Sequence, residues 1–191
     1  IKKFIFEIDN INFQKSVLKR YNQFHSYNEK ESFSVIDKSF ENFYNIEAIL
    51  NIFPNAKFLH TYRNAIDATI SIYQAMLSEL SWTHKIEDIL NYINNYKEIM
   101  KHFYLKYPEK IMDINLENFT QDSERVAEKI FEFCQLKWNK KALEFYKRNN
   151  LFSKTASFNQ IRKKVLVYDT KKYEPYVHLL QNYKNKFNWL K

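Results

Sequence analysis

The sequence predicts a helix-rich α/β fold with a mostly parallel sheet and helices on both faces. Short apolar and aromatic runs of strand length lie near residues 34–38, 57–62 and 110–115. The stretches between these runs repeat their apolar residues at helical spacing. Strands that alternate with helices in this way are typical of parallel sheets joined by right-handed crossovers.

The first part of the chain, residues 1–33, is expected to be a helical lead-in. Apolar residues recur at helical spacing from Ile1 to Ile8 and again from Phe13 to Phe24, with a candidate break at Asp9 and Asn10. We expect residues 34–191 to complete a single domain, because 191 residues can bury one substantial core.

The first predicted strand, Ser34–Lys38, ends in charged residues. A lysine at the carboxyl end of a strand can stabilise negative charge that develops on a transferred group. The alternative is that Lys38 is a solvated rim residue paired with an acidic neighbour. A helix from Asn42 to Ile52 is expected next, and it leads to a turn at Pro54.

The second predicted strand runs directly into a helix. After the apolar run Lys57–Tyr62, the spacing of apolar residues becomes helical and stays so to about Leu80. Asn64 is a plausible N-cap, and Asp67 resembles the acidic arm of a capping box. Arg63 therefore sits between the carboxyl end of a strand and a helix N-terminus, which is where open α/β sheets bind ligands and where anions are favoured.

Arg63, Asp67 and Ser71 share one helical stripe, since they are spaced by four residues. An arginine fork and a serine hydroxyl near a helix N-terminus can hold a phosphate. Two alternatives stay open at this point. Arg63 can pair with Asp67 instead, and Ser71 can simply face a neighbouring helix.

The second half of the chain contains the third predicted strand, Lys110–Asn115. A long amphipathic helix, Ile86–Tyr107, precedes it and is stopped by Pro108. Helices are expected at Ser123–Cys134 and Ala142–Tyr146.

Composition limits the classes of function. The net charge of +8 favours anionic ligands, although biased use of lysine across the whole chain can also produce it. No apolar run approaches membrane-spanning length. Cys134 is the single cysteine and the five histidines are scattered, so we expect no metal site and no disulfide framework. A reducing compartment, and hence a cytoplasmic location, is the simpler expectation.

A polar and basic stretch, Thr155–Lys164, ends in Arg162, Lys163 and Lys164. These side chains suit a phosphate, and they equally suit a solvated basic loop.

At this point the residues carry a family resemblance. The segment Phe53–Tyr73, with Phe-Pro-Asn-Ala-Lys at its start and Arg63 and Ser71 within it, resembles the 3′-phosphate-binding segment of certain sulfotransferases. These enzymes use 3′-phosphoadenosine 5′-phosphosulfate (PAPS). The nearest likeness is to bacterial sulfotransferases attached to tetratricopeptide repeats, and more distantly to tyrosylprotein sulfotransferases. The resemblance implies that Arg63 and Ser71 bind the 3′-phosphate of the donor.

Further segments agree with the family in order and spacing. Lys38 matches the family lysine at the reacting centre, and Ser157 matches the serine that positions the transferring sulfuryl group. Lys163 matches a lysine that holds the donor phosphate, and Arg162 beside it is taken as a further donor-binding residue. The segment Phe131–Trp138 matches too, with Gln135 standing where the family has glycine.

The resemblance also implies a three-layer fold like that of the P-loop kinases. Members of this family open with a strand and a glycine-rich loop that cradles the 5′-phosphosulfate with backbone N–H groups. The chain has no glycine at all. We therefore expect the first strand, this loop and the general base to lie upstream of Ile1. The resemblance also implies that tetratricopeptide repeats can be attached upstream.

The function implied is transfer of a sulfuryl group from PAPS to a hydroxyl or similar acceptor, which is a small molecule, a glycan or a peptide. One alternative is a degenerate, non-catalytic nucleotide-binding or interaction domain. A basic nucleic-acid-binding protein is the other alternative, but the charges are dispersed and no nucleic-acid motif appears, so we expect no nucleic-acid partner.

Overall fold

The computed structural model describes residues 12, 15–17, 19–20, 36–148 and 162–190. By their internal contacts the residues form two compact units. The first unit comprises Ile1–Ala56 with Ile99–Lys106, and the second comprises Lys57–Glu98 with Tyr107–Lys191. One long helix, α5 (Ile86–Lys106), contributes to both units.

The first unit is helical where it is described. Residues 12, 15–17 and 19–20 are helical, and the rest of the predicted lead-in lies outside the described residues. A 3₁₀ turn, Asn42–Asn45, passes into α3 (Ile46–Ile52). Ile46 and Leu50 lie one helical turn apart and are buried. The Glu47 carboxylate on α3 forms an ion pair with Lys106 at the end of α5.

The prediction of a first strand over residues 34–38 is wrong for its described part. Ile36, Asp37 and Lys38 are in no strand, and residues 34–35 lie outside the described residues. Ile36 is 89% exposed, so it gains nothing from burial on a sheet. Instead, the Asp37 carboxylate accepts hydrogen bonds from the backbone N–H and the hydroxyl of Ser39, at 2.8 and 2.6 Å. Such side-chain bonds favour a turn over a strand.

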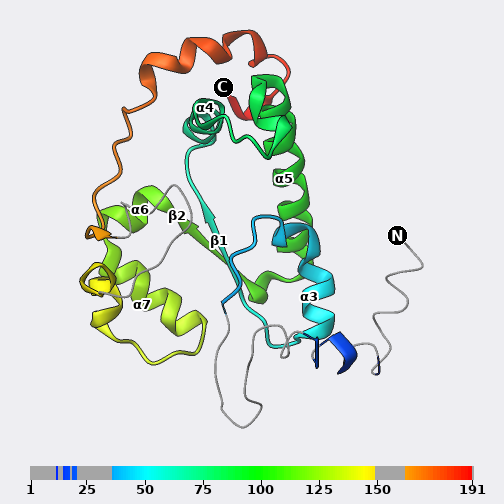
Figure 1. Cartoon of the computed structure of the whole chain (residues 1–191), viewed down its shortest axis with the longest axis vertical. Coiled ribbons are helices and arrows are strands. Elements are labelled where there is room, and N and C mark those ends of the chain that lie inside the picture. The colour runs from blue at the N-terminus through cyan, green and yellow to red at the C-terminus, as the bar shows by residue number, and fades with distance from the viewer. Residues whose placement is uncertain (1–11, 13–14, 18, 21–35, 149–161, 191) are drawn as a thin grey trace. The chain divides into compact units, whose positions relative to one another are not determined.

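The second unit contains a parallel two-stranded sheet. The strands β1 (Phe58–Tyr62) and β2 (Ile111–Asn115) run side by side with Phe58 opposite Ile111 and Tyr62 opposite Asn115 (Figure 1). Both agree with the predicted strands to within one residue. Since the strands are parallel and in register, their carboxyl ends meet at one edge.

The helix after β1 is shorter than predicted. The helix α4 spans Ala65–Ala75 rather than reaching Leu80. It ends because Met76 adopts a left-handed conformation with φ 39°, and its N–H donates to the carbonyl oxygen of Ile72. Met76 and Leu77 are exposed, so no buried apolar stripe favours continuing the helix. A 3₁₀ turn at Ser81–His84 then leads into α5.

Two helices follow β2. The helix α6 (Leu116–Gln121) was not predicted; it is a six-residue helix whose N-cap, Asn115, accepts a hydrogen bond from the N–H of Asn118. The helix α7 (Ser123–Phe133) was predicted correctly and is capped by Asp122. The predicted helix near Ala142–Tyr146 is a kinked 3₁₀ segment, Lys140–Lys147.

The C-terminal segment completes the core of the second unit. It consists mainly of the 3₁₀ segments Glu174–Tyr183 and Asn188–Leu190, and it lies beside α4 and α5 in Figure 1. Its buried residues pack with Ile70 of α4 and Leu90 of α5; they are Tyr173, Leu180, Phe187 and Leu190. This packing fixes Tyr173 next to α4. Within the described ranges, no helix has the length and apolar character needed to cross a bilayer.

Candidate functional site

The candidate site lies where β1 and β2 end. Arg63 follows the last residue of β1, and the next residue, Asn64, caps α4. The Asn64 side-chain oxygen accepts hydrogen bonds from the N–H groups of Ile66 and Asp67, at 2.8 and 3.3 Å. The predicted N-cap is therefore confirmed. The strand ends, the helix N-terminus and Arg63 meet at one point.

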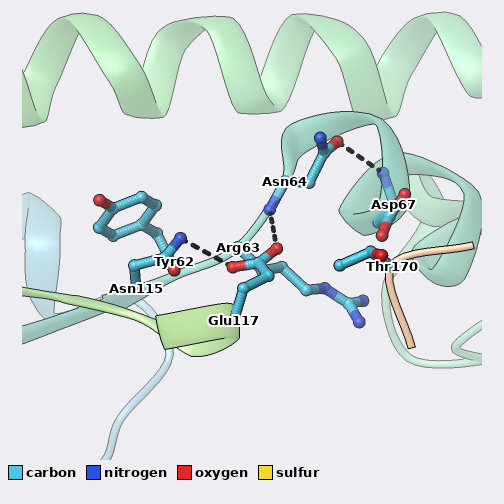
Figure 2. A pocket seen from close by; sticks show the side chains of 7 residues that line it. All are labelled: Tyr62, Arg63, Asn64, Asp67, Asn115, Glu117 and Thr170. Carbon is cyan, nitrogen blue, oxygen red and sulfur yellow. Dashed lines mark hydrogen bonds between the residues drawn. The ribbon is translucent and has the colours of Figure 1, made fainter. Parts of the chain in front are cut away.

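A pocket of about 320 Å³ opens at this junction. Seven residues line it, from both strand ends, the first turns of α4 and α6, and the C-terminal segment: Tyr62, Arg63, Asn64, Asp67, Asn115, Glu117 and Thr170. Figure 2 shows the Arg63 side chain extending away from Tyr62, toward the side where Asp67 and Thr170 lie. The pocket thus holds one cationic side chain and two carboxylates.

Glu117 joins the two strand ends. One carboxylate oxygen accepts the backbone N–H of Asn64 at 2.8 Å, and the other accepts the Asn115 amide at 2.7 Å (Figure 2). We expected Asp67 to supply the acidic arm of a capping box, and that expectation is wrong. Glu117, in the first turn of α6, accepts the backbone N–H of Asn64, which is the N–H that such an arm would accept.

Arg63 is held by aromatic side chains. Its Nη1 donates to the Tyr168 hydroxyl at 3.4 Å. Its guanidinium carbon lies 6.0 Å from the ring centre of Tyr168 and 5.8 Å from that of Tyr173. Among the described residues, no ion pair joins Arg63 to Asp67. The Asp67 carboxylate, which is 7% exposed, instead accepts the Tyr168 hydroxyl at 2.9 Å.

Ser71 is half-buried and lies by the same aromatic cluster. Burial raises the pKa of Tyr173, but a hydrogen bond with Ser71 and the charges of Lys172 and Arg63 outweigh it, so the pKa lies below its ordinary value. Arg63 and Ser71, predicted as partners from their spacing, are therefore brought to one tyrosine. The link of Tyr173 to both residues was not predicted.

The other predicted site residues are placed less fully. Lys38 is exposed and belongs to the first unit. Ser157 lies outside the described residues. Arg162 and Lys163 are exposed at the start of an extended segment that leads to Tyr168. These four assignments stay predictions.

A second polar cluster was missed in the sequence. His60 of β1 lies opposite Asp113 of β2, and its Nδ1 is 2.6 Å from the carboxylate oxygen. Its Nε2 contacts the hydroxyl of Tyr96 on α5. No local pattern indicated it, because the pair depends on the register of two strands and joins residues 53 positions apart. Where the structure is described, no group of His, Cys, Asp and Glu side chains is arranged to hold a metal ion.

Comparison with known proteins gives the family. Residues 6–140 match the model of the Sulfotransferase family. A similar sequence is an "Uncharacterized protein" of Aquifex aeolicus (strain VF5), with 32% identity over 146 residues. This alignment covers 74% of the chain and 19% of the relative, so the chain spans about a fifth of that protein's length.

The family match contains Lys38, Arg63 and Ser71, and it ends before Ser157, Arg162 and Lys163. It also begins well before Lys38, the first residue that the resemblance in the sequence matched. Because it covers well over half of the 191 residues, the chain belongs to the sulfotransferase family.

Proposed function

We propose that this chain provides the 3′-phosphate half of the donor site of an enzyme that transfers a sulfuryl group from PAPS to a hydroxyl acceptor. The observation that carries the proposal is the position of Arg63, at the carboxyl end of β1 and directly before the N-terminus of α4. A guanidinium at that point adds a charge-assisted fork to the free N–H groups of the helix. Membership of the sulfotransferase family supports sulfate as the group transferred.

The roles of the site residues follow from this proposal. Arg63 and Ser71 bind the 3′-phosphate, with Arg162 and Lys163 adding positive charge. Lys38 and Ser157 act near the transferring sulfuryl group. Sulfuryl transfer resembles phosphoryl transfer, because it needs in-line geometry and stabilisation of charge more than covalent chemistry.

The proposal extends to the parts that these residues need. The enzyme has a three-layer fold of the P-loop-kinase type and a glycine-rich loop for the 5′-phosphosulfate, and it requires no metal. A single domain, attached tetratricopeptide repeats and a cytoplasmic location belong to the same proposal. The acceptor is a small molecule, a glycan or a peptide.

The test is donor binding by the full-length protein. Calorimetry with adenosine 3′,5′-bisphosphate, the product that PAPS leaves, is compared for wild type and Arg63→Ala. We expect a loss of about 30- to 150-fold, since a hydrogen-bonded charge pair contributes roughly 2–3 kcal/mol. Arg125→Ala, at an exposed position on α7, removes the same charge and is expected to bind normally. Equal affinity for wild type and Arg63→Ala would overturn the assignment.

A second candidate is a non-catalytic domain that binds the nucleotide without transferring sulfate. This candidate predicts that the full-length protein lacks the glycine-rich phosphosulfate loop, which needs glycine for its conformation. A transfer assay with radiolabelled PAPS and a panel of phenolic, sugar and peptide acceptors separates the two. Binding without transfer to any acceptor, and without hydrolysis of PAPS, would favour the second candidate.

A further inference from the structure

A tyrosine hydroxyl bridges the charged groups of Arg63 and Asp67. Asp67 lies in the first turn of α4, and Arg63 stands just before Asn64, the N-cap of that helix. The Tyr168 hydroxyl contacts both side chains. It donates to Oδ2 of Asp67 at 2.9 Å and accepts from Nη1 of Arg63 at 3.4 Å. The two charges thus interact through one hydroxyl group.

Tyr168 is held in this position by its backbone. Its N–H donates to the Thr120 hydroxyl at 3.0 Å, and that hydroxyl donates to the carbonyl oxygen of Glu117, also at 3.0 Å. Tyr168 is thereby fixed to α6, the helix that follows β2. Its position does not depend on the charged groups alone.

The tyrosine also stays protonated across the physiological range. Burial and the hydrogen bond to Asp67 raise the pKa of Tyr168 to about 12, although the charge of Arg63 opposes the shift. The neutral hydroxyl can therefore always donate to the carboxylate. A phenolate at this place would instead repel Asp67 and neutralise Arg63.

Asp67 is a competitor for any anion that binds Arg63. Its carboxylate is 7% exposed, so water screens its charge poorly. A direct, forked pair with this carboxylate would occupy the same N–H groups of Arg63 that a phosphate needs. Satisfying the carboxylate with a neutral donor leaves the guanidinium available.

We propose that Tyr168 is a positioning residue, which keeps Asp67 from pairing with Arg63 and so keeps Arg63 available to the 3′-phosphate of the donor. This inference rests on the proposed function, because it assumes that Arg63 binds that phosphate. It assigns a role in donor binding to a residue outside the region of the family match.

The test is a double-mutant cycle in the full-length protein, with adenosine 3′,5′-bisphosphate as the probe in calorimetry. Tyr168→Phe removes the hydroxyl and keeps the ring, and we expect about tenfold weaker binding as Arg63 turns to Asp67. Asp67→Asn is expected to bind as tightly as wild type or more tightly. Adding Tyr168→Phe to Asp67→Asn should then change affinity by less than twofold, because the competing charge is gone.

A role confined to structural support, or direct contact of Tyr168 with the ligand, would give a different cycle. In either case Tyr168→Phe would weaken ligand binding by the same factor in wild type and in Asp67→Asn. That result would overturn the inference. Unchanged binding by Tyr168→Phe alone would overturn it too. Tyr176→Phe, at an exposed position in the same C-terminal segment, is the matched control and is expected to bind normally.

Two further measurements keep the test decisive. Circular dichroism shows whether each variant folds, and Asp67→Ala replaces Asp67→Asn in the cycle if the latter does not fold. Arg63→Ala separates this inference from the proposed function. Normal binding by Arg63→Ala would refute the function assigned to Arg63, whereas weak binding with an additive cycle would refute only the role of Tyr168.

Discussion

Glu117 joins the turn that carries Arg63 to the turn that starts α6, and its removal should destabilise the protein. In Glu117→Ala, the backbone N–H of Asn64 and the side-chain amide of Asn115 both lose their carboxylate acceptor. The negative charge in the first turn of α6 is lost as well. We expect this variant to lower the free energy of unfolding by about 1–2 kcal/mol.

The magnitude follows from burial. Hydrogen bonds to a charged group contribute roughly 1.5–3 kcal/mol each when they are well buried. Here Glu117 is only half-buried and Asn64 is exposed, so water can replace part of what is lost. We therefore expect the two hydrogen bonds together to contribute no more than the lower end of this energy range. Glu117→Gln keeps one acceptor oxygen and should lower the free energy of unfolding by about half as much.

Urea denaturation followed by intrinsic fluorescence measures this difference. A shift in midpoint without a change in slope would indicate a change in stability alone. The control is Glu98→Ala, which removes the same charge from an exposed position on α5. If Glu117→Ala and Glu98→Ala unfold at the same urea concentration, the carboxylate does not hold the two turns together and the reasoning fails.

Two further predictions concern conformation and ionisation. Gln135 has φ 57°, so Gln135→Gly should raise the free energy of unfolding by about 0.5–1 kcal/mol, because relief of left-handed strain exceeds the added chain entropy. Thermal unfolding measures this change. Lys137 has no positive φ, so the control Lys137→Gly should lower stability in the same assay. The pKa values of the two tyrosines are tested by titrating phenolate absorbance against pH. Subtracting the Tyr168→Phe curve from the wild-type curve should leave a transition with its midpoint near pH 12. Subtracting the Tyr173→Phe curve should leave a transition with its midpoint below the ordinary 10.0. Midpoints that coincide would contradict the environment described for Arg63.

The elements that could be predicted are those with a strong apolar period or a clear stop signal. β1 and β2 were found because short apolar runs were bounded by turn residues, and α5 because its stripe is long and Pro108 follows it. The failures have local causes. Residues 36–38 look like a strand, but they bury nothing and Asp37 bonds its own turn.

The candidate site was predicted in part, for a related reason. The positions of Arg63 and Asn64 between β1 and α4 were predicted correctly, because they depend on neighbours in the sequence. The partners of Arg63 were not, because Tyr168 lies 105 residues away and no period or spacing links the two. Glu117 was not predicted as a site residue, since its bond to Asn64 spans 53 residues. Contacts of this kind depend on the fold and cannot be obtained from a local pattern.

The division of the site between two parts of the chain has a consequence for donor affinity. Arg63 and Ser71 lie within the region that matches the family, whereas Tyr168 and Tyr173, which hold them, lie beyond residue 140. The groups proposed to bind the phosphate can therefore stay the same while the residues that control their charge and position change. If Tyr168 controls the availability of Arg63, donor affinity in related proteins should vary with the residue at that position even where the arginine is identical. Substitutions there would adjust affinity without removing the group that binds the phosphate.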